Sequence, residues 1–244
     1  MTKEFWVEWK NKTKMEEKAI ISIRKAKRVL FENIPKEKIY AIYIKGSFVR
    51  REMNEKSDVD IIPITYDNKT LEKVKKLEET RGNLYKPSEF VSHSLKEFEQ
   101  GKRHLKSKSP KGGVDTVLRN LHKYKLIYGK PLDITKYPMR SDLEFLKGHI
   151  GAFREIFIPM SKEKKFSFSD IMKQVFFLVE RAERLKGNEP PESWKALANS
   201  INNKNHIIHY ALQYRLNPTK DPKVRAKLLA KLQQYLERLS KKYI

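Results

Sequence analysis

Two carboxylates stand two residues apart in the segment Ser57-Asp58-Val59-Asp60-Ile61-Ile62. The apolar residues around Asp60 predict a β-strand. Because strand side chains alternate between faces, Asp58 and Asp60 should point to the same side. Neighbouring carboxylates repel each other, and a divalent cation between them removes that cost. Mg²⁺ prefers oxygen ligands and commonly takes one or two carboxylates together with substrate phosphates. The pair therefore predicts a magnesium site that handles phosphates.

Gly46 and Ser47 follow the apolar segment 39–44, whose β-branched and aromatic residues predict a buried strand. Glycine lets another group approach the backbone closely, and serine is a favourable N-cap for the short helix that we expect next. Unpaired N–H groups at such a helix start bind anions. A phosphate-binding turn beside a metal site is the equipment of phosphoryl or nucleotidyl transfer.

The joint pattern resembles the polymerase-β-like nucleotidyltransferase superfamily, and within it the minimal and aminoglycoside (kanamycin) nucleotidyltransferases. Their approximate pattern, G-S-x-A-R-G-x-x-x-x-x-S-D-[IV]-D, is matched here by Gly46, Ser47, Arg50, Ser57, Asp58, Val59 and Asp60. Val49 replaces the small alanine of the pattern, and Arg51 replaces its glycine. The resemblance covers roughly residues 35–133.

The resemblance implies a metal-dependent enzyme that moves an NMP, with AMP from ATP as the first choice, to an acceptor hydroxyl and releases pyrophosphate. It implies two Mg²⁺ ions, replaceable by Mn²⁺, on Asp58, Asp60 and a third carboxylate from a neighbouring strand. Glu89 is the acid in the predicted strand 86–94. The nucleotide-binding residues that the resemblance implies are Gly46, Ser47, Arg50 and Ser57. Glu180 is the candidate for an additional base.

The remaining periodicity predicts an α+β fold with a catalytic domain at 1–135 and a helical bundle at 136–244. A short arm with Phe5, Trp6 and Trp9 should pack on the body, and Thr13 with Glu16 predicts a capping box. The helices predicted in the first domain are 13–33, 70–80, 95–102 and 114–127, with a basic loop at 107–113. Only helices are predicted in the second: 141–158, 169–186, 193–201, 206–216 and 221–243. This bundle resembles the acceptor-binding domain of aminoglycoside nucleotidyltransferases.

Composition narrows the class of protein. The chain has 53 Lys and Arg against 30 Asp and Glu, a net charge of +23, which attracts polyanions. The lysines are scattered, with modest clusters at 102–111 and at the C-terminal end, and no nucleic-acid-binding motif accompanies them.

No apolar run reaches the roughly 20 residues of a membrane span, no secretory start is evident, and cysteine is absent. We expect a cytoplasmic protein without a membrane partner.

The sequence does not identify the acceptor. A small molecule, a protein (as for antitoxin-like AMP-transferases) and RNA all remain open, as does a non-catalytic nucleotide- or RNA-binding module with the same fold. Retention of the glycine, the serine and both aspartates argues against the non-catalytic alternative. The oligomeric state is also open, with a dimer among the options.

Overall fold

The computed structural model describes residues 4–55, 57–104, 113–163, 165–191 and 193–244. The chain divides into two compact units, Met1–Met139 (unit 1) and Arg140–Ile244 (unit 2). Each unit has a hydrophobic core of its own. The predicted basic loop at 107–113 lies, except for Gly113, outside the described residues.

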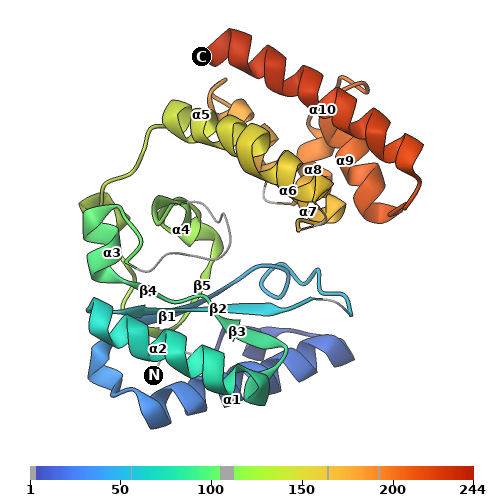
Figure 1. The fold of residues 1–244 in the computed structure, drawn as a ribbon. Helices are drawn as coiled ribbons and strands as arrows, with labels where there is room; N and C mark the ends of the chain where they lie inside the picture. Colours follow the sequence, from blue (N-terminus) through green and yellow to red (C-terminus); the bar gives the residue numbers. More distant parts are fainter. Residues whose placement is uncertain (1–3, 56, 105–112, 164, 192) are drawn as a thin grey trace. The chain divides into compact units, whose positions relative to one another are not determined.

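A mixed five-stranded sheet forms the centre of unit 1 (Figure 1). Its strands are β1 (Ile39–Lys45), β2 (Val59–Thr65), β3 (Ser88–Phe90), β4 (His93–Ser94) and β5 (Lys125–Gly129). The order is β3-β2-β1-β5, and β4 also pairs with β2. β1 runs antiparallel to β2 and β5, whereas β3 and β4 run parallel to β2. The sheet and its helices confirm the predicted α+β class.

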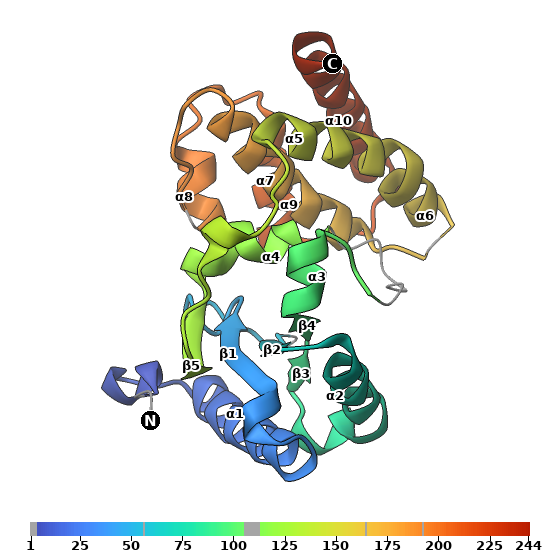
Figure 2. The same cartoon turned by 90° about the vertical axis from the view of Figure 1, so that its left-hand side faces the viewer.

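Helices cover both faces of this sheet (Figures 1 and 2). One face carries α1 (Lys14–Asn33) and α2 (Asn68–Arg81), and the other carries α3 (Leu95–Gln100) and α4 (Asp115–Asn120). Because side chains alternate along the strands, the sheet has one hydrophobic core on each of its faces. Alternate residues of β1 and β2 pack with α1 and α2, and the residues between them pack with Phe98, Val117 and Leu118. Because Asp60 alternates with Val59 and Ile61, it belongs to the face opposite α1 and α2.

The segment predicted as one helix at 114–127 is a helix followed by a strand, so that prediction is wrong over its second half. α4 is followed by a 3₁₀ turn (Leu121–Lys123) and then by β5, which pairs with β1. Pairing with a strand far away in sequence overrides the local helical period. The strand predicted at 86–94 is likewise interrupted, since β3 and β4 are separated by Val91 and Ser92.

Unit 2 consists of helices, as predicted. They are α5 (Asp142–Ala152), a π-helical turn (Phe153–Phe157), α6 (Ile158–Lys162), α7 (Phe168–Arg184), α8 (Trp194–Asn199), α9 (Ile207–Leu216) and α10 (Pro222–Tyr243). Side-chain N-caps at Ser141, Ser167, Ser193 and Asp221 start α5, α7, α8 and α10. Among the described residues, no helix combines the length and apolarity needed to cross a membrane.

The turn after β1 is a single helical turn rather than the short helix predicted there. The N–H of Glu52 donates to the carbonyl of Ser47 at 2.8 Å, and the N–H of Arg51 donates to that of Phe48 at 3.1 Å. This is the Schellman pattern, in which the residue at the Arg51 position adopts the left-handed conformation. Arg51 has φ +57°. Arg51 therefore replaces the glycine of the sequence pattern at the position whose backbone conformation most favours glycine.

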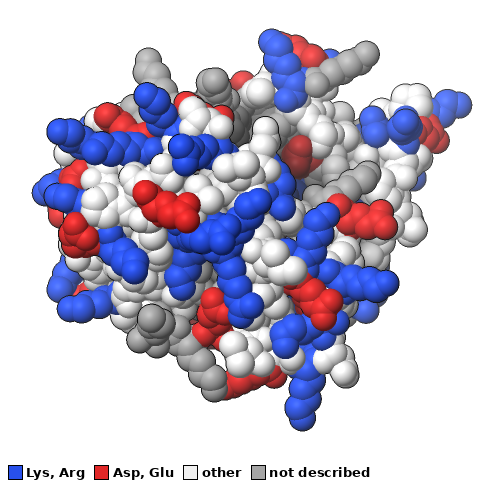
Figure 3. Space-filling view, turned by 90° about the horizontal axis from the view of Figure 1, so that it is seen from below, with Lys and Arg blue, Asp and Glu red and all other residues white. Residues whose placement is uncertain are grey.

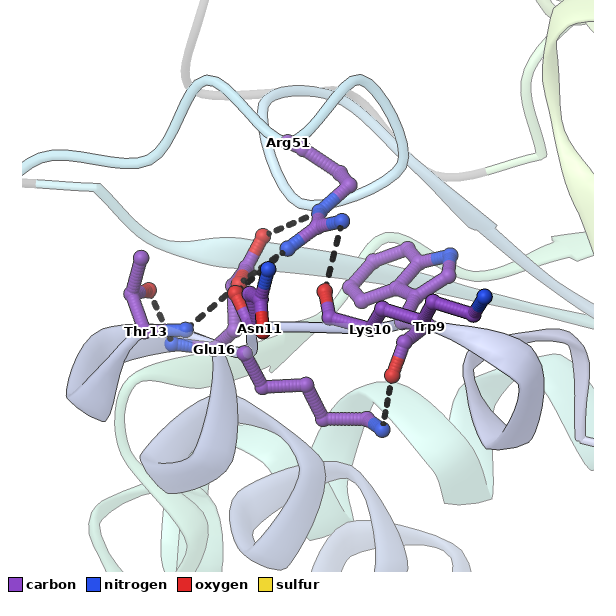
Figure 4. A network of polar contacts seen from close by, with 7 residues as sticks. Trp9, Lys10, Asn11, Thr13, Glu16 and Arg51 are labelled. Carbon is purple, nitrogen blue, oxygen red and sulfur yellow. Dashed lines mark hydrogen bonds and ion pairs between the residues drawn. The ribbon is translucent and has the colours of Figure 1, made fainter.

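Glu16 holds Arg51 in this conformation (Figure 4). The guanidinium donates to both Glu16 carboxylate oxygens at 2.8 and 3.0 Å, and to the carbonyls of Lys10 and Asn11 at 3.2 and 3.1 Å. It also lies 5.0 Å from the ring centroid of Trp9. Glu16 is the buried partner, and hydrogen bonds from Arg51 lower the pKa of its carboxyl.

The same carboxylate closes the capping box of α1, which confirms that prediction. The N–H of Thr13 donates to Glu16 Oε2 at 2.8 Å, and the N–H of Glu16 donates to Thr13 Oγ1 at 3.2 Å. Phe48 anchors the turn from its other side, because it is fully buried against Phe5, Trp6 and Trp9 of the N-terminal arm. The turn, the arm and the start of α1 thus form one packed block.

Replacing Arg51 should separate its ion pair from its backbone strain. Arg51→Ala loses the pair and keeps the strained φ, whereas Arg51→Gly loses the pair and relieves the strain. We expect thermal transition temperatures in the order wild type, Arg51→Gly, Arg51→Ala, with steps on the order of 3 °C. Fluorescence of Trp6 and Trp9 in a Trp194→Phe background reports on unit 1. Equal stability of the two variants would refute the strain argument, and wild-type stability in both would refute the contribution of the pair.

Gly129 closes β5 at a point where a side chain cannot fit. It has φ +82°, and an added Cβ would lie 2.0 Å from the carbonyl oxygen of Tyr40. We expect Gly129→Ala to lower the free energy of unfolding of unit 1 by more than ~2 kcal/mol. Gly151 in α5 is the matched control, with nothing within 4 Å of an added Cβ, so Gly151→Ala should stabilise by ~0.5–1 kcal/mol. Urea unfolding measures both, and a tolerated Gly129→Ala would show that the β1–β5 pairing is placed wrongly.

Candidate active site

The backbone register brings the predicted acids to one place on the sheet. Asp60 of β2 pairs with Glu89 of β3 in parallel register, and with Lys45 of β1 in antiparallel register. Residues paired across neighbouring strands point to the same face. Asp60, Glu89 and Lys45 therefore share the face opposite α1 and α2.

β3 is only three residues long, yet both residues that flank Glu89 are fixed by hydrogen bonds to side chains of the helices. The N–H of Ser88 donates to Ser22 Oγ of α1 at 3.0 Å, and the two serine hydroxyls are 2.7 Å apart. The N–H of Phe90 donates to Glu78 Oε2 of α2 at 2.8 Å. Two helices behind the sheet therefore set the position of Glu89 on its front face.

Lys45 is a site residue that the sequence analysis did not single out. Its Nζ lies 3.8 Å from Asp60 Oδ2, and about a quarter of each side chain is exposed. The sequence feature that could have identified Lys45 is its position at the end of β1, directly before Gly46. Gly46, with φ +88°, follows it, and an added Cβ there would come within 3.4 Å of Asp60 Oδ2. The absence of a side chain at Gly46 keeps one side of the Asp60 carboxylate open.

The other predicted site residues are Asp58, Ser57, Ser47 and Arg50, and they lie in the turn after β1 or just before β2. Asp58 is exposed and precedes β2, which begins at Val59 rather than at the predicted Ser57. Ser57 closes a turn, since its hydroxyl accepts from the N–H of Asn54 at 2.9 Å. Ser47 lies in the one-turn helix after Gly46. The Arg50 guanidinium pairs with Glu52 at 2.7 Å.

The donors at this centre suit a hard cation, although they do not form a closed cage. Among the described residues, no group of three His, Asp or Glu side chains is gathered closely enough to hold a metal ion. Asp60 does have a cationic partner in the Lys45 ammonium. A carboxylate that is partly exposed, beside an open glycine and with a second aspartate two residues away, fits a Mg²⁺ ion that takes its other ligands from substrate phosphates and water.

A buried pair lies on the chain after β3. His93 Nδ1 is 3.1 Å from Glu97 Oε2, and both side chains are fully buried. Burial lowers the pKa of His93, with nearby cations that include Lys45 acting in the same direction. Burial acts to raise the pKa of Glu97, but hydrogen bonds from His93 and from the N–H of His104 outweigh it, and the net shift is downward. A neutral His93 that donates from Nδ1 satisfies the ionised Glu97, whereas His93 Nε2 is buried without a hydrogen-bond partner.

In unit 2, Glu180 accepts from Arg184 Nη2 at 3.3 Å and has a largely buried side chain. It lies in α7, one turn before its partner, as expected for an i,i+4 pair on a helix. Its assignment as an additional base stays a prediction.

Comparison with solved structures identifies the fold. Spectinomycin adenyltransferase AAD(9) from Enterococcus faecialis, solved with ATP and spectinomycin, matches with a TM-score of 0.50 at 15% identity and covers 88% of this chain and 99% of its own. A candidate nucleotidyltransferase from Sulfolobus solfataricus matches with a TM-score of 0.28 at 20% identity, over 38% of this chain and 85% of its own. A toxin-antitoxin structure with AMP-PNP matches with a TM-score of 0.26 at 20% identity, over 64% of this chain and 98% of its own.

No family model matches the chain, and no curated protein matches it. The assignment therefore rests on shape and on the residues at the sheet. The first match extends over 88% of this chain, which is more than unit 1 contains, so it includes residues of both units. The chain shares its fold with the adenyltransferase AAD(9).

Proposed function

We propose that the protein is a metal-dependent nucleotidyltransferase. It moves the nucleotidyl group of a nucleoside triphosphate, with ATP as the first candidate, to a hydroxyl group of an acceptor. The observation that carries the proposal is the register that places Asp60, Glu89 and Lys45 on one face of the sheet beside Gly46. The fold supports it, because AAD(9), which shares the fold, was solved with ATP.

In the proposed reaction the acceptor oxygen forms a bond to the α-phosphorus, and the bond from that phosphorus to the bridging oxygen of pyrophosphate breaks. The electron pair of the broken bond leaves with pyrophosphate. The proton of the acceptor hydroxyl passes to a carboxylate oxygen of Glu89, which acts as general base. Asp58 and Asp60 would hold Mg²⁺, which would supply positive charge to neutralise the triphosphate and the charge developing on it.

In the proposed complex, the turn after β1 binds the β- and γ-phosphates of the triphosphate. The first N–H groups of a helical turn have no acceptor within that turn, so those that follow Gly46 are available to phosphate oxygens. The Lys45 ammonium lies next to the turn and contributes a further positive charge. These groups bind the substrate in the ground state, and the carboxylates act on the reacting atoms.

Label transfer tests the reaction. Full-length protein is incubated with Mg²⁺ and ATP labelled on either the α- or the γ-phosphate, together with a small-molecule extract, RNA or total protein. We expect α-label in one acceptor pool, γ-label only in pyrophosphate, and loss of both with EDTA. Asp60→Asn should lower the rate by at least ~10²–10³-fold. Glu79→Gln, an exposed acid on α2, is the matched control and should retain the wild-type rate.

Two outcomes contradict the proposal. γ-Label on the acceptor would identify a phosphotransferase instead, because attack would then occur at the terminal phosphorus. Absence of α-label from every pool, with all four triphosphates and with Mn²⁺ also supplied, would identify a binding module that has kept the fold. Wild-type activity in Asp60→Asn would place the site elsewhere.

Glu89→Gln separates chemistry from binding. The amide keeps the shape of the side chain and cannot accept a proton, so we expect kcat to fall by ~10²–10⁴-fold. ATP binding, measured by equilibrium dialysis, should stay within a few-fold of wild type, because the turn after β1 holds the phosphates independently. Loss of ATP binding with unchanged stability would instead assign Glu89 to the triphosphate or metal site, and an unchanged kcat would remove it from the reaction.

A further inference from the structure

The last helix, α10, has a buried side and a charged side. Its buried residues pack into the core of unit 2; they are Leu228, Leu232, Tyr235, Leu236 and Leu239. Ser240 Oγ also accepts from Arg154 Nη2 of the π-helical turn at 2.8 Å. The helix is therefore fixed along one side, and its opposite residues face away from that core.

Basic residues form a row along one flank of α10. At 100° per residue, the row occupies an arc of about 100° and is about 28 Å long at 1.5 Å per residue. We call it the α10 basic stripe; it consists of Lys223, Lys227, Lys231, Arg238, Lys241 and Lys242. Gln234 and the exposed Val224 occupy the other positions in this arc, and the arc contains no acidic residue.

The helix itself offers the stripe a single acid, Glu237, which stands four residues before Lys241. Among the described residues, none of its lysines or its arginine forms an ion pair with an acid; Lys231 instead lies 4.3 Å from the ring centroid of Tyr210 on α9. Lys227 stands four residues from both Lys223 and Lys231, a spacing at which like charges destabilise a helix. Helix stability therefore does not explain the arrangement.

The two long helices of unit 1 mix their charges. α1 carries six basic and three acidic residues, and α2 carries five and three, whereas α10 carries seven and one. Figure 3 shows the molecule from below, with Asp and Glu side chains interspersed among Lys and Arg. A general surplus of lysine would produce mixed surfaces of this kind, so the single sign of the α10 stripe needs a separate reason.

We propose that the α10 basic stripe binds the phosphate backbone of single-stranded RNA. Lysines four residues apart are about 6 Å apart along the helix. Phosphates along one strand of a duplex advance by only about 3.4 Å per nucleotide, and an extended single strand spreads them further apart. A straight row suits one extended strand better than the curved backbone of a duplex. The exposed Gln234 amide, which lies in the same row, can bond a ribose 2′-hydroxyl.

A lipid surface fits this helix less well. A helix that binds in a membrane interface inserts its apolar side, and the apolar side of α10 is occupied by the core of unit 2. Attraction would then depend on charge alone. Anionic vesicles are therefore included as a competing partner in the test.

The test compares two variants of equal net charge. Binding of the full-length protein to a fluorescent single-stranded RNA of about ten nucleotides, which covers the stripe, is measured by anisotropy without triphosphate or metal. The α10 variant carries Lys223→Gln, Lys227→Gln and Lys231→Gln. The control carries Lys69→Gln, Lys73→Gln and Lys76→Gln on α2, where all three lysines are exposed. Lysine and glutamine have similar helix propensities, and circular dichroism checks that both variants fold.

We expect the α10 variant to bind RNA at least tenfold more weakly at ~0.1 M salt, and the slope of log K against log[salt] to fall by about 2. The control should stay within about threefold of wild type, since mixed surfaces contribute few phosphate contacts. Equal losses in both variants would show that only net charge matters, and an unchanged α10 variant would place RNA binding elsewhere. Tighter binding to the matching single-stranded DNA or to phosphatidylserine vesicles than to RNA would also overturn the proposal. None of these results depends on catalysis.

Discussion

The pair between Glu16 and Arg51 fixes the part of unit 1 on which the candidate site depends. Arg51 ends the turn after β1 in a left-handed conformation, and Glu16 holds its guanidinium while also capping α1. Two turns further along the same helix, Ser22 bonds Ser88 of β3. One helix therefore holds both sides of the site, the turn that follows Gly46 and the strand that carries Glu89. A shift of α1 would move both sides together, which preserves their spacing.

The electrostatics of the site follow from this arrangement. Asp60 stands between an acid on one neighbouring strand and a cation on the other, Glu89 and Lys45. Lys45 offsets the repulsion between the two carboxylates when no substrate is present, so the sheet tolerates acids in register. A nucleoside triphosphate bound together with a divalent cation would bring negative phosphates near Lys45 and a positive ion near Asp60. The open side at Gly46 is then the position at which the phosphates can approach Asp60 without a steric clash.

Local patterns predicted much of this structure. The first two strands, the capping box at Thr13, α2 and the helices of unit 2 each follow from periodicity and caps within a short window. β5 was missed because the apolar residues of 114–127 satisfy a helical period, while the pairing of Ile127 and its neighbours with β1 is long-range. The turn after Gly46 was predicted as a helix because Ser47 is a good cap, whereas Arg51 stops it after one turn.

The residue types of the candidate site were predictable from the sequence, whereas their register was not. Asp58 and Asp60 are two residues apart, which predicts a common face by strand alternation, but β2 begins only at Val59. The alignment of Glu89 with Asp60 depends on the hydrogen bonds that Ser22 and Glu78 accept from β3, and neither residue belongs to a recognisable motif. Lys45 enters the site only through the antiparallel register of β1 and β2.

The charges of the chain act at two different ranges. Around the turn after β1, cations are matched with acids: Lys45 with Asp60, Arg50 with Glu52, and Arg51 with Glu16. Such pairs cancel beyond a few ångströms, so this region presents specific contacts rather than a broad field. Residues 203–244 hold ten Lys or Arg against two Asp or Glu, and most of these cations lie along α10. An unpaired row keeps its potential out to the Debye length of ~8–10 Å, so a polyanion responds to this row rather than to the net charge of the whole chain.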